Sequence, residues 1–412
     1  MDAFSKTPDS TTRPIPEPGA GSRHVQESLE TRAIHGGGDP GGESGRPVTP
    51  PIVQSSTFHG GLPGDETPLA YTRYGVNPNQ VAVGRKMAHL EGMEEGLVTA
   101  SGMAAISLTL LALVRNGDHL VSSVHLYGAT RNFMERELPR RGVEVTFVDP
   151  DNPRSWRHAL RPETRGLYLE MPTNPMLRVF DPRPVSRLAL ERGLPLIMDA
   201  TFATPMNFRA ADHGVDVVVH SATKYLGGHS DLIAGVICGP AALIDEVRGL
   251  LRLYGPSADP HMAWLLDRGL RTLPVRMARH NENALALAHW FAGSEGVERV
   301  IHPFHDDHPD AEIARELLSG GGGMLGVVVE GGEAGAVAFC RALELAAVAP
   351  SLGGVETLVS LPAWTSHRTL TGAEREARGI APGFVRISVG LEGLEDLKRD
   401  FRRGLAAVLS GH

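Results

Sequence analysis

The sequence predicts an α/β fold, with a larger domain built on a parallel sheet and a smaller C-terminal domain. Between residues 77 and 270, short apolar runs alternate with helical patterns, which is typical of parallel strands joined by helices. After residue 297 the strand and helix patterns are mixed, which indicates a second α/β unit. A chain of 412 residues with 42% hydrophobic content is long enough to bury both cores.

Composition excludes several classes of function. The net charge of −8 and the pI near 6.1 argue against nucleic acid as the main partner. No apolar run approaches the ~20 residues of a membrane span, and the N-terminus has no secretory signal pattern. Cys238 and Cys340 lie in apolar segments and form no CxxC pair. We therefore expect both in the core of a cytoplasmic protein.

The chain begins with segments that do not resemble compact elements. Residues 1–28 are rich in Ser, Thr, Pro and Gly, and we expect them to be disordered. Residues 29–76 are too rich in Pro and Gly for a compact element, so we expect an extended arm lying on another surface, such as a second subunit. The large domain would span residues 77–270 and the small domain 271–412. A long helical region near residues 260–292 would join them.

Tyr71 and Arg73 stand at the end of the arm, before a helix that Asn77 or Asn79 can cap. In an extended chain their side chains would share a face. A hydroxyl beside a guanidinium suits a phosphate group. A packed tyrosine beside a solvated arginine is the alternative.

Strand, turn and helix patterns follow one another after this helix. In GLVTASGMAAI, Ser101 and Gly102 stand at a helix start, where unpaired N–H groups and the helix dipole attract anions. In HLVSSVHLYGAT, Tyr127 stands at the turn, where its ring could cover a planar ligand; an ordinary packed tyrosine is the alternative. A later strand ends at Glu170. Asn174 follows it where an amide could bond a cofactor oxygen, although turn chemistry also explains the TNP sequence.

Asp199 and Lys224 are the most informative pair. Each follows a buried apolar run, and in one parallel sheet both would emerge at the edge where α/β sheets bind ligands. Because lysine is rare in a chain that otherwise uses arginine, Lys224 calls for a role that arginine cannot fill. Pyridoxal 5′-phosphate (PLP) needs an amine that forms a Schiff base and an acid that keeps its ring nitrogen protonated. Taken singly, a strand-end acid and a surface amine would be the simpler interpretation.

Signatures of other cofactors and of metals are missing from the sequence. No GxGxxG lies between a strand and a helix, which counts against a nicotinamide enzyme. The glycines at 320–323 lack the Lys that follows in a P-loop. His302, His305 and His308 stand near acids on what we expect to be a surface loop. Without an HExxH-like cluster we expect no metal site.

The candidate residues described above, Asp199 and Lys224 among them, lie in motifs by which the chain resembles the Cys/Met-metabolism family of PLP-dependent enzymes. This transsulfuration group includes cystathionine γ-synthases, cystathionine γ- and β-lyases, methionine γ-lyases and homoserine-ester sulfhydrylases. The family's motifs occur in its order from about Thr31 to the C-terminal helix: YTRYGVNPN, ASGMAAI, LYGAT, EMPTNP, DATFATP, HSATKYLGGHSD, SLGGVETL and VRISVGLE. The resemblance implies PLP fold type I, aspartate-aminotransferase-like, with a mostly parallel seven-stranded sheet in the large domain and a smaller C-terminal α/β domain.

The resemblance also implies roles for the matching residues. Lys224 is implied to be the Schiff-base lysine, Asp199 the partner of the pyridine nitrogen, and Tyr127 the residue that stacks on the ring and protonates the leaving group. Ser351 and Arg386, together with Tyr127, are implied to bind the substrate. The residues implied to bind the cofactor are Tyr71, Arg73, Ser101, Gly102, Met103, Tyr127, Asn174, Asp199, Thr201, Ser221, Thr223 and Lys224.

One of these roles also has a physical argument from the sequence. Arg386 lies in the strand VRISVG between apolar neighbours, and a half-buried guanidinium there needs an anionic partner. The α-carboxylate of a substrate would supply it. A structural ion pair is the alternative.

The implied assembly is a homotetramer made of two active dimers, in which Tyr71 and Arg73 reach the cofactor phosphate of the neighbouring subunit. The implied reaction is γ-replacement or γ-elimination on homoserine esters or cystathionine, as in cystathionine γ-synthase or γ-lyase. Cystathionine β-lyase, O-acyl-homoserine sulfhydrylase and methionine γ-lyase are the alternatives within the family. Pro350 stands where several γ-synthases and γ-lyases have Glu, and Ala129 where methionine γ-lyases often have Cys. A catalytically silent scaffold or an aminotransferase is the alternative outside this group.

Overall fold

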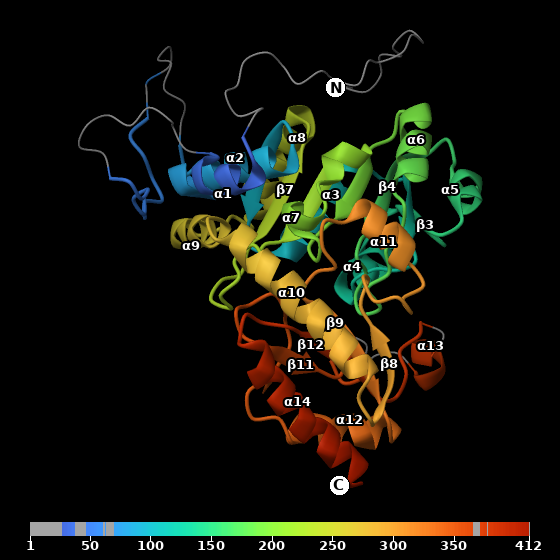
Figure 1. The fold of residues 1–412 in the computed structure, drawn as a ribbon. Helices are drawn as coiled ribbons and strands as arrows, with labels where there is room; N and C mark the ends of the chain where they lie inside the picture. Colours follow the sequence, from blue (N-terminus) through green and yellow to red (C-terminus); the bar gives the residue numbers. More distant parts are fainter. Residues whose placement is uncertain are drawn as a thin grey trace.

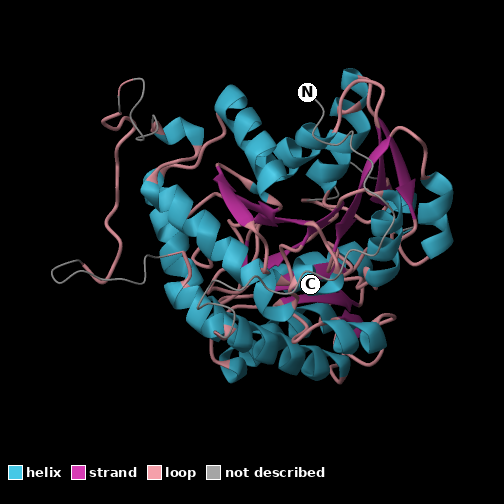
Figure 2. Ribbon diagram, turned by 90° about the horizontal axis from the view of Figure 1, so that it is seen from above, coloured by secondary structure: helices cyan, strands magenta, loops and turns pink. Residues whose placement is uncertain are grey.

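The computed structural model shows two lobes, each built around a β-sheet (Figure 1). It describes residues 27–37, 47–60, 62, 70–365, 371–376 and 378–411. Seen from above, the strands lie inside and the helices surround them (Figure 2). No helix in these described ranges is long and apolar enough to cross a membrane.

The large sheet has seven strands in the order β1-β7-β6-β5-β4-β2-β3. All neighbouring strands from β6 to β3 are parallel, and β7 is antiparallel to both of its neighbours. The mostly parallel seven-stranded sheet is therefore confirmed. The strands are β1 (Glu95–Thr99), β2 (His119–Ser123), β3 (Glu144–Val148), β4 (Thr164–Glu170), β5 (Leu196–Asp199), β6 (Val217–Ser221) and β7 (Gly235–Gly239).

Helices cover both faces of this sheet, which explains why its strands are apolar without alternation. In β7, Val236 and Cys238 belong to the apolar cluster that includes α2 (Pro78–Glu91), whereas Ile237 belongs to the cluster with α3 (Gly102–Leu113) and α8 (Ala241–Tyr254). The other helices and turns of this lobe are α4 (Gly128–Asn132), η3 (Phe133–Glu137), η4 (Pro139–Arg141), α5 (Pro153–Ala159), α6 (Arg183–Arg192), α7 (Thr204–Asn207) and η5 (Ala210–His213).

The helical region near residues 260–292 consists of two helices, α9 (Pro260–Leu270) and α10 (Leu273–Ala292). Pro274 explains the break, because proline has no N–H to continue the hydrogen-bond ladder but is tolerated in a first turn. α10 runs from the large lobe into the small one (Figure 1). The predicted boundary between residues 270 and 271 falls at this break, and the division into domains stays a prediction.

The small lobe contains a five-stranded sheet in the order β10-β11-β12-β9-β8, mostly antiparallel. α14 packs along it because Leu397, Phe401 and Leu405 recur every fourth residue and are buried. The elements of this lobe are β8 (Val297–Ile301), β9 (Met324–Val329), α12 (Gly332–Arg341), β10 (Ala347–Val348), β11 (Leu358–Ser360), α13 (Gly372–Glu376), β12 (Phe384–Ser388) and α14 (Leu394–Leu409). α11 (Ala311–Leu317) lies between β8 and β9 in the sequence but packs against the large lobe, where Ala314 and Leu317 join the apolar cluster of β4 and β5 (Figure 1). A smaller C-terminal α/β unit is thus confirmed.

The N-terminal arm differs in part from the prediction. Helix α1 (Leu29–His35) forms where we expected extended chain, since Ser28 accepts a hydrogen bond from Thr31 N and Ala33 packs into the core. The segment after it does lie along the body, where Asn79 Nδ2 donates to Pro51 O (2.9 Å). Most of residues 1–28, predicted to be disordered, lie outside the described residues.

Arg73 does not lie in extended chain, and that prediction is wrong. It belongs to a 3₁₀ turn, η2 (Thr72–Tyr74), which closes through a hydrogen bond from Tyr74 N to Tyr71 O (2.8 Å). Gly75, with φ of +74°, lets the chain leave this turn. Asn77 caps the following helix, with Gln80 completing a capping box.

Candidate active site

The carboxyl ends of the parallel strands bring the predicted polar residues together at one edge of the large sheet. Asp199 ends β5, and Lys224 follows the neighbouring parallel strand β6. Glu170 ends β4 directly opposite Asp199, and Tyr127 follows β2 on the far side of β4. This edge is where ligands bind in open α/β sheets.

Lys224 is partly buried, and its amine meets the small lobe. Nζ donates a hydrogen bond to Ser351 Oγ at 2.8 Å. Burial, together with the positive charge of Arg386, lowers the pKa of Lys224 to about 8. A substantial fraction of the amine is therefore neutral near physiological pH, as a nucleophile or base requires.

The Ser351 turn holds its hydroxyl in place at some conformational cost. Ser351 has a φ of +89°, a region that side chains other than glycine rarely adopt. Gly353 follows with φ of +80°, and a Cβ there would lie 2.6 Å from Tyr225 N. The turn therefore packs directly on the backbone that carries Lys224.

Arg386 is a buried cation whose acceptors in the described part of the chain are all neutral. It is 7% exposed, and its guanidinium donates to Ser360 Oγ (3.2 Å), Asn174 Oδ1 (3.2 Å) and Ser351 O (3.1 Å). No described Asp or Glu accepts from it, so the alternative of a structural ion pair finds no support in this part of the chain. Burial lowers its pKa to about 10. A carboxylate ligand would complete its coordination.

Asp199 is buried, and Thr201 links it to the end of β6. Oδ1 accepts hydrogen bonds from Thr201 N (3.0 Å) and Thr201 Oγ1 (2.6 Å), and Thr201 Oγ1 accepts one from Ser221 N (2.9 Å). Burial raises the pKa of Asp199. Among the described residues none donates to Oδ2, so this oxygen can accept from a ligand.

The start of α3 forms the other end of the site. Ser101 caps the helix by accepting from Ala104 N (3.1 Å), which leaves the amides of Gly102 and Met103 at the first turn. A Cβ on Gly102 would lie 2.6 Å from Ser221 Cβ, so only glycine allows this approach. The Met103 side chain turns to Thr130, whose hydroxyl donates to Sδ (3.9 Å).

The hydroxyl of Thr223 forms hydrogen bonds with the backbone of a nearby residue. Its Oγ1 donates to Ala234 O (3.3 Å) and accepts from Ala234 N (3.1 Å), so it ties the Lys224 loop to β7. Contact between this hydroxyl and a cofactor stays a prediction.

Tyr127 and Asn174 flank the site. Tyr127 is 41% exposed, so its ring is accessible. Burial lowers the pKa of Arg386 and the nearby Tyr127 partly offsets this, which places the hydroxyl in the same neighbourhood as the guanidinium. The backbone amides of Tyr127 and Asn174 both donate hydrogen bonds to the side-chain oxygens of Glu170, at 2.6 and 3.2 Å.

Tyr71 and Arg73 do not contact this cluster within the described part of their own chain. The Arg73 guanidinium lies over the rings of Tyr71 and Tyr74, 5.6 and 5.2 Å from their centroids, and donates to Arg252 O. None of the recorded contacts of either residue is with Lys224, Asp199 or Arg386.

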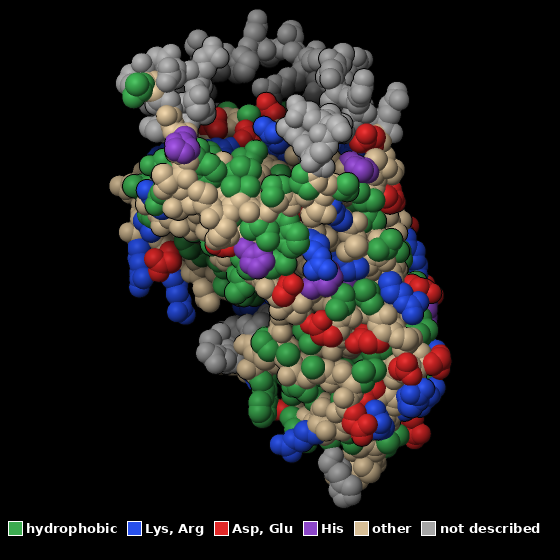
Figure 3. Space-filling model, turned by 90° about the vertical axis from the view of Figure 1, so that its left-hand side faces the viewer, with side chains coloured by type: hydrophobic (Ala, Val, Ile, Leu, Met, Phe, Trp, Pro, Cys, Tyr) green, Lys and Arg blue, Asp and Glu red, His purple; other side chains and the backbone are tan. Residues whose placement is uncertain are grey.

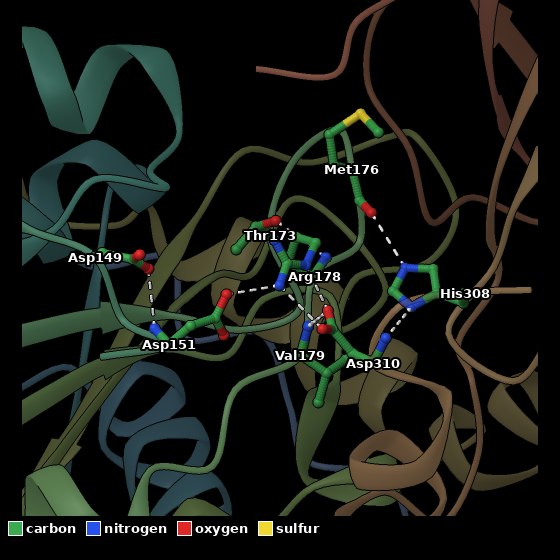
Figure 4. A network of polar contacts seen from close by, with 8 residues as sticks. All are labelled: Asp149, Asp151, Thr173, Met176, Arg178, Val179, His308 and Asp310. Atoms are coloured by element: carbon green, nitrogen blue, oxygen red, sulfur yellow. Dashed lines mark hydrogen bonds and ion pairs between the residues drawn. The ribbon is translucent and has the colours of Figure 1, made fainter. Parts of the chain in front are cut away.

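A polar network anchors the loop that carries Asn174 to the start of α11 (Figure 4). Asp310 accepts from Arg178 Nε at 2.6 Å and Nη2 at 3.0 Å, and Asp151 accepts from Arg178 Nη2 at 2.7 Å. Hydrogen bonds to these carboxylates raise the pKa of Arg178. The segment 173–179 is thus held at its far end by an ion-pair network.

His302, His305 and His308 lie beside this network and are buried, so our expectation of a surface loop was wrong. Each Nδ1 accepts the backbone N–H two residues later, at 3.2 to 3.4 Å. Burial lowers the pKa of His302 to about 3 and also lowers that of His308. Because each ring accepts a hydrogen bond from its own turn, the three imidazoles are accommodated here.

Sequence reasoning missed Arg276, which supports the Lys224 loop from α10. Its guanidinium is buried and donates to Tyr225 O and Gly269 O, both at 2.7 Å. Burial lowers its pKa to about 10. The motif RGLRTLPVRM was visible, but nothing in the local pattern indicated which backbone carbonyls this arginine would meet.

Known proteins of one family match most of the chain. The sequence profile of the family described as "Cys/Met metabolism PLP-dependent enzyme" matches residues 30–406. The chain is 41% identical over 369 residues to an L-methionine γ-lyase of Fusobacterium nucleatum, covering 87% of this chain and 93% of that one. It is 38% identical to a cystathionine γ-lyase of Bacillus subtilis, covering 92% of this chain and 99% of the other.

Solved structures show the same fold. The structure of a cystathionine γ-synthase from Xanthomonas oryzae pv. oryzae, in complex with aminoacrylate and cysteine, superposes with a TM-score of 0.88 at 36% identity. The superposition covers 93% of this chain and 99% of that one.

Proposed function

The chain belongs to the Cys/Met metabolism family of PLP-dependent enzymes, and we propose that it catalyses γ-replacement or γ-elimination on homoserine esters or cystathionine. The observation that carries this proposal is the buried Arg386, which has only neutral acceptors among the described residues and lies near the amine of Lys224. A carboxylate receptor next to an amine-bearing site is what an α-amino acid needs. The proposal therefore names a cystathionine γ-synthase or γ-lyase.

The residues present fit each part of PLP. The depressed pKa of Lys224 suits attachment to the cofactor's aldehyde, and the open oxygen of Asp199 suits its ring nitrogen. The Gly102 backbone, pressed against Ser221 at the start of α3, suits its phosphate. When bound, PLP supplies a protonated ring that stabilises negative charge at the substrate's Cα.

The chain's own residues would then position the substrate and move its protons. Arg386 and Ser351 would bind the α-carboxylate and set the direction of the Cα–H bond. Lys224 Nζ, with a pKa near 8, would take the Cα proton. Tyr127 Oη, on the exposed side of the site, would give a proton to the leaving γ-substituent.

The assembly is part of the same proposal. We propose active dimers, paired as a tetramer, in which Tyr71 and Arg73 serve the neighbouring chain's site. Their lack of contact with their own Lys224 supports this, and so do the exposed apolar side chains over the large lobe (Figure 3). Exposed apolar residues of the N-terminal arm and the large lobe include Ile52, Ile233, Leu253 and Tyr254. A cytoplasmic location is also proposed, which the two unpaired buried cysteines support.

A paired assay of the purified, PLP-loaded enzyme tests the reaction. O-succinyl-, O-acetyl- and O-phosphohomoserine are offered with cysteine, and cystathionine is offered alone. Cystathionine, ammonia and 2-oxobutyrate are measured. We expect cystathionine from one ester, or 2-oxobutyrate from cystathionine, and neither from a Lys224→Ala variant.

Other products would contradict this assignment. Homocysteine and pyruvate from cystathionine would indicate a β-lyase, and methanethiol from methionine without turnover of the other substrates would indicate a methionine γ-lyase. Homocysteine formed from an ester and sulfide, but no cystathionine with cysteine, would indicate a sulfhydrylase.

A further inference from the structure

Glu170 ties together two loops of the site. It is the last residue of β4 and is 5% exposed. Oε2 accepts a hydrogen bond from Tyr127 N at 2.6 Å, and Oε1 accepts one from Asn174 N at 3.2 Å. Because one loop follows β2 and the other follows β4, a single carboxylate fixes the backbones of both.

Both loops present a side chain to the reacting groups. Tyr127 carries the exposed hydroxyl, and Asn174 Oδ1 accepts a hydrogen bond from Arg386 Nη1 at 3.2 Å. A shift of either backbone would therefore move the proposed proton donor or the proposed carboxylate receptor. The far end of the Asn174 loop is held separately, by the Arg178–Asp310 network (Figure 4).

Burying a carboxylate at this position, beside a second one, is energetically unfavourable. Glu170 is paired in register with Asp199, and burial together with the nearby Asp199 raises the pKa of Glu170. The hydrogen bonds from the amides of Tyr127 and Asn174 act in the opposite direction and favour the carboxylate. A glutamine would avoid the like charge, but it has only one oxygen and could accept from only one of the two amides. The geometry thus uses the one property that the carboxylate has and the amide lacks, namely two acceptor oxygens.

We propose that Glu170 is a positioning residue of the reaction, which holds Tyr127 and Asn174 by their backbone amides in the arrangement that protonates the leaving group and orients Arg386. This role rests on the proposed function. It acts through Tyr127 and Asn174, and Glu170 itself touches neither substrate nor cofactor.

The variant Glu170→Gln tests this role through the leaving group. A thioether leaves as a basic thiolate and needs the proton from Tyr127, whereas succinate leaves as a weakly basic carboxylate and needs it less. We expect kcat/KM to fall ~10- to 100-fold on cystathionine and several-fold less on O-succinylhomoserine. Glu170→Asp, which keeps two acceptor oxygens, should recover part of the loss.

Asp400→Asn is the matched control. Asp400 is a fully buried carboxylate that also accepts from backbone amides, those of Glu344 (2.9 Å) and Ala346 (2.9 Å), but it lies on α14 of the small lobe. Asp400→Asn should lower the free energy of unfolding. It should leave the ratio of kcat/KM on cystathionine to kcat/KM on O-succinylhomoserine unchanged. A Glu170→Gln variant that keeps this ratio at the wild-type value would overturn the proposal.

Hydrogen exchange of the holoenzyme gives a readout that does not depend on turnover. Peptides containing Tyr127 and Asn174 should exchange faster in Glu170→Gln than in wild type and in Asp400→Asn. Unchanged protection of both peptides would overturn the proposal. Failure of the wild-type enzyme on every substrate would refute the proposed function alone, because the exchange experiment would still decide whether Glu170 holds the two loops.

Discussion

Two cations close to each other set the chemistry of the site at the scale of single residues. Burial keeps the pKa of Lys224 at about 8, and Arg386 adds a repulsive contribution. Arg386 itself has only neutral acceptors among the described residues. A bound carboxylate would neutralise Arg386 and so remove part of the effect on Lys224. The site is thus arranged to respond to its ligand.

Arg386→Lys tests the carboxylate receptor. Lysine keeps the charge but loses the planar fork, so we expect KM for amino-acid substrates to rise about 10- to 100-fold, with a smaller change in kcat. Steady-state kinetics with each substrate measure both. Arg399→Lys, at an exposed ion pair with Asp396, is the control and should stay near wild type. An unchanged KM in Arg386→Lys would mean that the carboxylate binds elsewhere.

At the scale of elements, three segments distant in the sequence meet at the Lys224 loop. The turn of residues 351–354 packs on the Tyr225 backbone, and Gly353 N donates to Ser388 Oγ of the small sheet (2.9 Å). Arg276 of α10 binds the Tyr225 carbonyl from the other side. Two parts of the C-terminal half therefore hold the loop, in addition to the hydrogen bonds of its own Thr223.

Gly353→Ala tests this packing. The new Cβ would lie 2.6 Å from Tyr225 N, and φ is +80°, so we expect a loss of more than ~1 kcal/mol in the free energy of unfolding. Gly249→Ala, on the exposed side of α8 with no atom within 4 Å, should instead gain ~0.5–1 kcal/mol. Denaturant unfolding of both variants measures the difference. Equal stability of Gly353→Ala and wild type would contradict the close approach.

At the scale of the whole molecule, the site is assembled from both lobes. Lys224 and Asp199 come from the large lobe, while Ser351 and Arg386 come from the small one, and α10 connects the two (Figure 1). Within the described part of their own chain, Tyr71 and Arg73 make no contact with Lys224, Asp199 or Arg386. If they complete the active site of a neighbouring chain, two variants that are each inactive alone should regain activity when they are mixed.

Mixing Lys224→Ala with Arg73→Ala chains tests this expectation. Each mixed dimer would have one site with both substitutions and one with neither, so random pairing should restore about a quarter of wild-type activity. The measurement is the specific activity after the mixed subunits dissociate and reassemble. Mixing Lys224→Ala with Arg386→Ala is the control and should restore nothing, because both residues belong to the same site. No recovery in the first mixture would mean that Arg73 acts within its own chain.

Much of the site could be predicted because its residues follow strands and begin helices. Asp199, Lys224 and Tyr127 stand after buried apolar runs, and Ser101 caps a helix, so local periodicity and capping chemistry place them at one edge. Glu170 was visible at a strand end, but its role depends on amides of two loops that only the folded sheet brings to it. The burial of His302, His305 and His308 likewise depends on contacts with distant segments.

The sequence by itself determined the α/β class with its mostly parallel sheet and the resemblance to the family, because these depend on patterns within short stretches. The tertiary structure alone decided which residues touch. It set Lys224 against Ser351, gave Arg386 only neutral acceptors among the described residues, tied two loops to Glu170, and placed the Arg73 guanidinium against Arg252 O. The reason is physical: hydrogen bonds and pKa shifts depend on distance and burial, and these arise only when segments far apart in the chain pack together.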